Sequence, residues 1–434
     1  MSPVLVGIIG ILFLFFLLAL RMQIGFCMAL VGFLGFAVLG SFESGFSILG
    51  MEPFKIGSNY GLTVIPLFIL MGQFANYSKM AFEVYETVYR WIGFLPGGLS
   101  MATIGACGGF AAISGSSLAA AATMGAVAMP EMKRFNYKDS LATGCIAAGG
   151  TLGILIPPST VMIIYGILTE QPIATLFIAG IIPGVLLTCL FIFTIYIITR
   201  IRPEMGPPGR KFTLKEKVSS LKGTWSIVAL FFLVMGGLYT GWFTPTEAAG
   251  VGAFGALVIT LIKKKLTWTN LNLSLSETIR TTAMVFLILI GAHIFGYFIT
   301  VSQIPDQLSS WISAMGLNRY VVIAILVLIY VILGCFMEGL AIMVLTIPII
   351  YPMVLEMGFD PIWFGVIITL VMEMSLITPP VGINVFILSG IAKEIPMYTI
   401  FRGVFPFWVA MLVCIILLVA FPQIALFLPM SMGG

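Results

Sequence analysis

The stretches Gly153-Ile-Leu-Ile-Pro-Pro-Ser159 and Ser375-Leu-Ile-Thr-Pro-Pro-Val381 lie 222 residues apart, and each places two consecutive prolines inside a long apolar segment. Proline removes a backbone N–H donor, and its ring clashes with the preceding helical turn, so two in a row interrupt a helix. The sequence therefore predicts two broken helices, over 139–170 and 361–392, each unwound near its middle.

The segments around these breaks are apolar enough to require a membrane. Hydrophobic residues make up 60% of the 434 residues and charged residues only 9%, whereas a soluble domain carries about 25% charged residues. We therefore predict an all-α integral membrane protein without a soluble domain and without a nucleic-acid partner. The predicted spans, each long enough to cross about 30 Å of hydrocarbon, are 3–20, 23–40, 62–76, 139–170, 173–199, 225–240, 247–262, 278–300, 361–392 and 399–421.

Two further apolar stretches, 98–130 and 321–356, are too long for a single span. Each has small or turn-forming residues near its middle, at Ser114-Gly115-Ser116-Ser117 and at Gly334–Gly339. We predict that each forms a re-entrant hairpin, which enters and leaves the membrane on the same side. Non-helical backbone at that depth is tolerated only where it is buried in protein or faces a cavity.

The distribution of positive charge supports this assignment. With the N-terminus outside and each hairpin counted as no crossing, every Lys and Arg except Lys55 and Arg319 falls on the cytoplasmic side, as the positive-inside rule requires. Treating either hairpin as a span would reverse everything after it and destroy this bias. The predicted orientation places both termini outside, and we expect the first span to be retained because it has no basic leader.

The broken helices belong to a repeat that covers nearly the whole chain, since Pro130 and Pro352 match at the same 222-residue spacing. The first half makes an odd number of crossings, so the second half begins inverted. Secondary transporters share this inverted-topology duplication, and their site lies near the bilayer midplane between the repeats. We predict a first repeat over 1–200, a basic cytoplasmic linker over 201–224 and a second repeat over 225–434.

Two short segments, 78–93 and 304–316, carry apolar residues on one helical face and polar residues on the other. Helices of this kind lie along the membrane interface. Each is either a surface anchor or an arm that joins a moving part of the protein to a fixed frame.

The breaks and the hairpin tips supply the candidate binding groups. Unwound carbonyls at Ile156–Ser159 and Thr378–Gly382 suit a cation, and half-helix N-termini suit an anion. The first tip adds three hydroxyls at the start of an Ala-rich helix. The structural alternatives are a kink, an N-cap and close packing of small residues. Candidate solute contacts are Ser116, Ser159, Thr160, Thr378, Pro379, Gly382 and Asn384.

Ionisable residues within the apolar segments are further candidates. A charge at the bilayer centre costs about 2.5–3.5 kcal/mol on insertion scales, so we expect Glu338 and Glu373 to have a role. His293, the only histidine, is either a proton shuttle or a buried hydrogen-bonding residue. The six cysteines are isolated, so the sequence predicts neither a disulfide framework nor a cysteine metal site.

Four runs together resemble the large membrane subunit of tripartite ATP-independent periplasmic (TRAP) transporters. They are Ile113-Ser-Gly-Ser-Ser-Leu118, Gly150-Thr-Leu-Gly-Ile-Leu-Ile-Pro-Pro-Ser159, Leu176-Phe-Ile-Ala-Gly-Ile-Ile-Pro-Gly184 and Thr244-Pro-Thr-Glu-Ala-Ala249. The resemblance implies a sodium-driven transporter in the bacterial inner membrane, which imports an acidic organic solute such as sialic acid or a C4-dicarboxylate. It also implies a periplasmic binding protein that delivers the solute. Because the outside of the bacterial inner membrane is the periplasm, the termini, predicted to lie outside, would be periplasmic.

The same resemblance implies a separate small four-helix membrane subunit, because no helices precede Pro3 to suggest a fused form. It further implies an elevator motion, in which hairpins and broken helices travel together against a scaffold of the other spans. Carried over to this sequence, the sodium ligands are Ser114, Ser116, Ser117, Gly153 and Pro157 around the first tip, and Gly334, Gly339, Thr378, Gly382 and Asn384 around the second. The second tip lacks serines, so backbone carbonyls would dominate there.

Three alternatives stay open at this point. A proton-coupled organic-anion transporter would share the fold but not the coupling ion. A channel would need rings of dipoles or charges along a pore. An intramembrane serine protease would need Ser116 or Ser117 within hydrogen-bond reach of His293 as the base.

Overall fold

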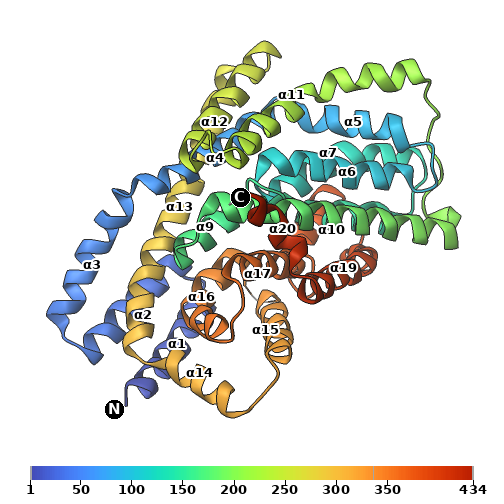
Figure 1. Ribbon diagram of the computed structural model, residues 1–434. Coiled ribbons are helices and arrows are strands. Elements are labelled where there is room, and N and C mark those ends of the chain that lie inside the picture. The colour runs from blue at the N-terminus through green and yellow to red at the C-terminus, as the bar shows by residue number, and fades with distance from the viewer. Residues whose placement is uncertain (1, 336, 433–434) are drawn as a thin grey trace.

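The computed structural model describes residues 2–335 and 337–432, and every regular element in this part of the chain is helical (Figure 1). Phe336, inside the predicted second tip, lies outside the described residues. The first half contains α1 (Pro3–Ala19), α2 (Ile24–Leu39), α3 (Phe42–Gly57), η1 (Tyr60–Thr63), α4 (Val64–Tyr77), α5 (Met80–Ile92), α6 (Gly98–Ser114), α7 (Ser117–Arg134), α8 (Asp139–Leu155), α9 (Thr160–Thr169) and α10 (Ile173–Ile201). The second half contains η2 (Pro203–Met205), α11 (Leu214–Tyr239), α12 (Pro245–Ile262), α13 (Trp268–Val301), α14 (Ile304–Ala314), α15 (Arg319–Gly334), α16 (Gly339–Glu356), α17 (Pro361–Ser375), α18 (Ile383–Ile391), α19 (Met397–Ala420) and α20 (Gln423–Met432).

The helix order confirms the predicted duplication. Helices α7 and α16 begin 222 residues apart, at Ser117 and Gly339, and also end 222 residues apart, at Arg134 and Glu356. In each half a short helix precedes a helical hairpin, which precedes a broken helix and a long helix. The hairpins α6–α7 and α15–α16 and the broken pairs α8–α9 and α17–α18 are therefore the same elements used twice.

The hairpins and breaks occur where the sequence predicts them. Gly115 ends α6 in the left-handed backbone region, at φ 58°, which costs glycine no steric strain. Helices α8 and α9 meet at a 40° bend across the Pro157-Pro158 pair. The second proline pair, Pro379-Pro380, lies between α17 and α18.

The helices form two bodies. In one, α2 packs along α13 and α4 packs along α12, with α1, α3 and α11 beside them. In the other, α8 packs against α6, α7 and α19, while α17 packs against α10 and against both helices of the second hairpin, α15 and α16, so elements of the two halves interleave. We call the first body the scaffold and the second the core domain; Figure 1 shows α1, α2, α3 and α13 grouped away from α6, α7 and α10.

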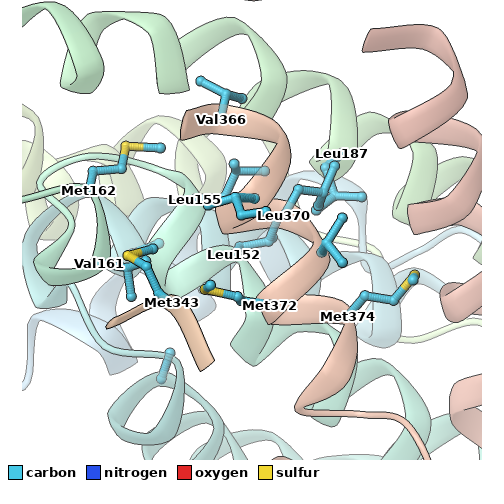
Figure 2. Close-up of a cluster of buried hydrophobic side chains, with 14 of the residues drawn as sticks. Leu152, Leu155, Val161, Met162, Leu187, Met343, Val366, Leu370, Met372 and Met374 are labelled. Carbon is cyan, nitrogen blue, oxygen red and sulfur yellow. The ribbon is translucent and has the colours of Figure 1, made fainter. Parts of the chain in front are cut away.

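The core domain is held together by close packing of apolar side chains. Figure 2 shows Leu155, Met162, Leu187 and Leu370 meeting from α8, α9, α10 and α17. Lipid tails are as apolar as leucine, so within a membrane this association depends on van der Waals contact rather than on exclusion of water. The broken helices of both halves thus belong to one packed unit.

The two amphipathic segments form helices between the bodies. Helix α5 packs on α6 of the first hairpin and on scaffold helix α11, and α14 packs on α16 of the second hairpin and on scaffold helices α1 and α13. We call α5 and α14 the arm helices; each touches the hairpin of its own half and the scaffold.

Four helical segments were not predicted: α3, the first part of α13, the first part of α11, and α20. Helix α3 carries Glu43, Glu52 and Lys55, which interrupt any apolar run; it meets the η1–α4 segment at a 56° bend. Its counterpart is the first part of α13, which runs unbroken for 34 residues and begins ten residues before the predicted span 278–300. Helix α11 begins inside the predicted linker 201–224, and α20 follows Pro422 at the C-terminal end.

By length and composition, six of the described helices could each cross a bilayer, or up to eight spans if each of the two bent pairs counts as one. Helices α1 and α2, both predicted as spans, are apolar but shorter, with 17 and 16 residues.

Candidate functional site

A cavity of about 250 Å³ lies where both hairpin tips and both broken helices meet the scaffold. Scaffold helices α4 and α13 contribute Ile69, Gly72, Gln73, Asn76, Thr281 and Met284. The first half of the core domain contributes Ser114, Gly115, Ser116, Ser117, Leu118, Ala119, Ile154, Thr160 and Val161, and the second half contributes Glu338, Gly339, Leu340, Met372, Glu373, Leu376 and Ile383. Five predicted site residues, Ser114, Ser116, Ser117, Thr160 and Gly339, therefore line one cavity.

The first tip lies directly on the first break. Thr160 Oγ1 donates a hydrogen bond to the Gly115 carbonyl at 3.3 Å. The Ser116 Oγ accepts a bond from the Ala119 N–H at 3.3 Å and so caps α7. Gly153 allows the close approach, because a Cβ at this position would lie 2.7 Å from the Ser116 carbonyl oxygen. The absence of a side chain at Gly153 therefore lets the first tip pack directly against α8.

The second tip lies on the second break in the same way. Cys335 Sγ donates to the Pro379 carbonyl at 3.1 Å, and Gly334 packs against Ser375. Glu338 precedes the first residue of α16 just as Ser116 precedes that of α7, but its side chain makes no capping hydrogen bond. The second tip therefore presents a carboxylate to the cavity where the first presents a hydroxyl.

One side-chain contact joins the two inverted halves at the cavity. Ser117 Oγ, the first residue of α7, donates to Glu373 Oε2 of α17 at 2.5 Å. Glu373 is 1% exposed. Neither Glu373 nor Glu338 lies within 4.0 Å of a Lys, Arg or His nitrogen in the described part of the chain.

The electrostatics of the cavity combine two opposite features. Ser117, Thr160, Gly339 and Ile383 are the first residues of α7, α9, α16 and α18, and all four line the cavity. Helix N-termini carry unpaired N–H groups and the positive end of the helix dipole, so they favour an anion. Two carboxylates also face the cavity, and none of its described lining residues is Lys, Arg or His. The cavity can therefore hold an anion together with a cation.

Oxygen atoms without partners suit a small hard cation. Ser114 Oγ and Asn384 Oδ1 are buried and have no hydrogen-bond partner in the structure. Asn384 Nδ2 donates to the Ala147 carbonyl at 3.2 Å, which fixes its amide against α8. The donor set around the tips consists of hydroxyl, carbonyl, amide and carboxylate oxygens, which fits sodium. No group of three or more His, Cys, Asp and Glu residues that could hold a metal ion was found among the described residues.

The structure places the remaining predicted residues outside this cavity. Thr378 and Pro379 line a separate pocket of about 290 Å³ beside α19, and Trp408 Nε1 donates to Thr378 Oγ1 at 3.1 Å. Ser159 caps α9 by accepting from the Met162 N–H. Gly382, at φ 55°, precedes α18, and Pro157 lies in the bend between α8 and α9.

Sequence reasoning missed the scaffold side of the cavity. Gln73 and Asn76 line it from α4, three residues apart and so on one helical face. Asn76 Oδ1 accepts a hydrogen bond from Thr123 of α7 at 3.0 Å, which links scaffold and hairpin. Two amides on one face of an otherwise apolar span were a signal that could have been found.

The protease alternative requires residues that the structure separates. Ser117 contacts Glu373, whereas the nearest acidic group to His293 is Glu52, at 3.7 Å from its Nδ1. His293 lines a different cavity, with Lys55 and the end of α9. A Ser–His pair is therefore not assembled at the first tip.

Duplicated hairpins and broken helices that converge on one cavity are typical of secondary transporters. Solved structures that share this fold include that of the Alcanivorax borkumensis YdaH transporter, with a TM-score of 0.64 at 14% identity, covering 91% of this chain and 89% of that one. Another is that of Neisseria gonorrhoeae MtrF, from a class of antimetabolite efflux pumps, with a TM-score of 0.59 at 12% identity, covering 88% and 84%. At such low identities the likeness concerns the fold alone.

The chain belongs to the family described as the tripartite ATP-independent periplasmic transporter, DctM component, which it matches over residues 11–424. It is 36% identical over 387 residues to the C4-dicarboxylate TRAP transporter large permease protein DctM of Pseudomonas aeruginosa, covering 89% of this chain and 90% of that protein. It is 32% identical over 414 residues to the sialic acid TRAP transporter large permease protein SiaM of Vibrio cholerae, covering 95% and 96%. The resemblance inferred from sequence motifs is thus confirmed.

Proposed function

We propose that this chain is the permease subunit of a sodium-coupled transporter in the bacterial inner membrane, which imports an acidic organic solute. The observation that carries the proposal is the cavity where four helix N-termini and two carboxylates meet. The N-termini suit the carboxylate of a solute, and the acids suit a coupling cation. C4-dicarboxylates and sialic acid are the leading candidate solutes, because the relatives DctM and SiaM carry these names.

Sodium is the proposed coupling ion, and it is a transported substrate rather than a resident cofactor. Ser114, Ser117 and Glu373 would hold it near the first tip, with Asn384 supplying a further oxygen from α18. The partnerless oxygens of Ser114 and Asn384 support this assignment. A proton is the alternative coupling ion, and the experiment below separates the two.

An elevator motion is the proposed mechanism. The hairpins and broken helices pack as one core domain, whereas the cavity lies at its boundary with scaffold helices α4 and α13. A sliding core domain would therefore carry its contents past the scaffold. A periplasmic binding protein and a small four-helix membrane subunit are the proposed partners, as the family name indicates a tripartite system.

The test is uptake into proteoliposomes that contain this chain and both partners. We expect a C4-dicarboxylate or sialic acid to accumulate only under an inward sodium gradient, with no accumulation under an inward proton gradient alone. Accumulation that follows the proton gradient and ignores sodium would contradict the coupling. Unitary currents in planar bilayers would contradict a transporter and favour a channel.

A further inference from the structure

The first part of helix α11, residues 214–225, has an apolar face that no part of the described chain covers. Leu214, Val218, Leu221 and Trp225 are 47–75% exposed. They are spaced by four, three and four residues, so they form one stripe along the helix. Most of this segment lies in the predicted linker 201–224, before the predicted span 225–240. Insertion of that span into the membrane therefore does not account for the apolar stripe.

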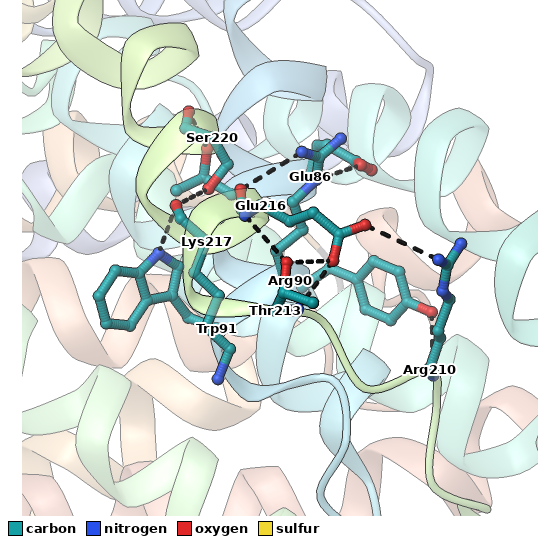
Figure 3. Close-up of polar contacts among 10 residues, drawn as sticks. Glu86, Arg90, Trp91, Arg210, Thr213, Glu216, Lys217 and Ser220 are labelled. Atoms are coloured by element: carbon teal, nitrogen blue, oxygen red, sulfur yellow. Dashed lines mark hydrogen bonds and ion pairs between the residues drawn. The ribbon is translucent and has the colours of Figure 1, made fainter.

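The opposite face of the same segment is bound to arm helix α5 (Figure 3). Trp91 Nε1 donates to the Lys217 carbonyl at 3.2 Å, and Arg90 donates to the Glu216 carbonyl at 3.4 Å. The N–H and hydroxyl of Thr213 donate to Glu216, which keeps the pKa of that carboxyl below its usual value. The helix therefore cannot rotate its apolar stripe onto the arm.

Lysines flank the stripe. Lys215 and Lys222 are seven residues apart on one side of it, and Lys211 lies just before the helix; all three are exposed. None of them forms an ion pair within the described residues, in contrast to Arg210, which lies 3.7 Å from Glu216. Their charge is therefore available to an external partner.

The stripe also continues into the membrane. Val228 and Phe232 extend it at the same spacing along the apolar part of α11 and are likewise exposed. An apolar face with flanking lysines that runs without interruption onto a membrane-spanning surface is typical of an interfacial helix segment. Lysines beside such a face attract anionic headgroups.

We propose that residues 211–225 form a binding surface for anionic phospholipid. The stripe inserts among the acyl chains, and Lys211, Lys215 and Lys222 contact the headgroups. Because the other face of the segment is bound to α5, the lipid anchors the arm of the first hairpin. A covering protein subunit or a second copy of this chain is the alternative occupant, and the test distinguishes it.

The test uses the full chain in proteoliposomes and the quenching of Trp225 fluorescence by brominated lipids. The contribution of Trp225 is the difference between wild type and Trp225→Phe. We expect brominated phosphatidylglycerol to quench this fluorescence at least about fivefold more effectively than brominated phosphatidylcholine at equal mole fraction. The reason is that one lysine near an anionic membrane surface raises the affinity for that surface by about this factor.

The variant Lys211→Gln/Lys215→Gln/Lys222→Gln should abolish the preference, and the corresponding Lys→Arg variant should retain it. The matched control is Lys79→Gln/Lys138→Gln/Lys264→Gln, which removes three other exposed lysines and should leave the preference intact. Equal quenching by both lipids, or an equal loss in the control, overturns the anionic site. Absence of quenching by either lipid overturns lipid as the occupant and favours a covering protein.

Discussion

Gly153→Ala should reduce sodium-driven uptake at least about fivefold. The new Cβ would lie 2.7 Å from the Ser116 carbonyl oxygen and 2.9 Å from the Ser117 nitrogen, and both are backbone atoms with no freedom to rotate away. Overpacking costs about 1–3 kcal/mol, and 1.4 kcal/mol corresponds to a factor of ten. The first tip must then move off the break, which separates the groups proposed to hold the cation. The measurement is the initial uptake rate in proteoliposomes.

Gly250→Ala is the matched control, because this glycine is also helical but a Cβ there would meet nothing within 4 Å. We expect uptake within about twofold of wild type, since replacing a helical glycine with alanine is favourable by about 0.5–1 kcal/mol where the added Cβ meets open space. Normal uptake by a well-folded Gly153→Ala protein would show that contact between tip and break is not required for transport.

Glu373→Gln should raise the sodium concentration for half-maximal uptake at least about tenfold. Glutamine keeps an oxygen that accepts the hydrogen bond from Ser117 but removes the negative charge. At an effective dielectric constant of about 20, a cation about 4 Å from a carboxylate gains about 4 kcal/mol, so loss of even half of that attraction lowers the affinity for the cation more than about tenfold. The measurement is the sodium dependence of uptake at saturating solute.

Glu277→Gln provides the comparison, since Glu277 is an exposed carboxylate on α13 outside the cavity. Its sodium dependence should equal that of wild type. An unchanged half-maximal sodium concentration in Glu373→Gln would remove this carboxylate from the proposed cation site.

The sequence predicted the fold where local chemistry decides it. Consecutive prolines at 157–158 and 379–380 cannot remain helical, and Ser114–Ser117 combines small residues with an N-cap, so breaks and tips follow from backbone physics. Helix α3 could not be found by the same means, because Glu52 and Lys55 interrupt its hydropathy. Glu52 and Lys55 form an ion pair with each other at 3.5 Å, and the hydroxyl of Tyr297 on α13, more than 230 residues away in the chain, hydrogen-bonds to both.

The candidate site was predictable only in part. Residues of both tips line the cavity. Thr378 Oγ1, in contrast, accepts a hydrogen bond from Trp408, and Asn384 Nδ2 donates one to the Ala147 carbonyl, and both bonds join helices that are distant in the sequence. The hydrogen-bond partner of a side chain at a break depends on which helix packs behind that break, and no local sequence pattern identifies that helix. Glu373 was recognised as costly inside a membrane, yet its contact with Ser117 of the other half required the three-dimensional structure.

The most direct test of the central claim asks whether solute and sodium occupy the cavity between the two tips. A single cysteine at Leu118, which lines the cavity, would be labelled with a maleimide in a background without the native cysteines, and Lys55→Cys, in the other cavity, would serve as control. We predict that solute and sodium together slow labelling at position 118 at least about tenfold and leave position 55 unchanged. Labelling at position 118 that is indifferent to both, in protein that still transports, would contradict the account.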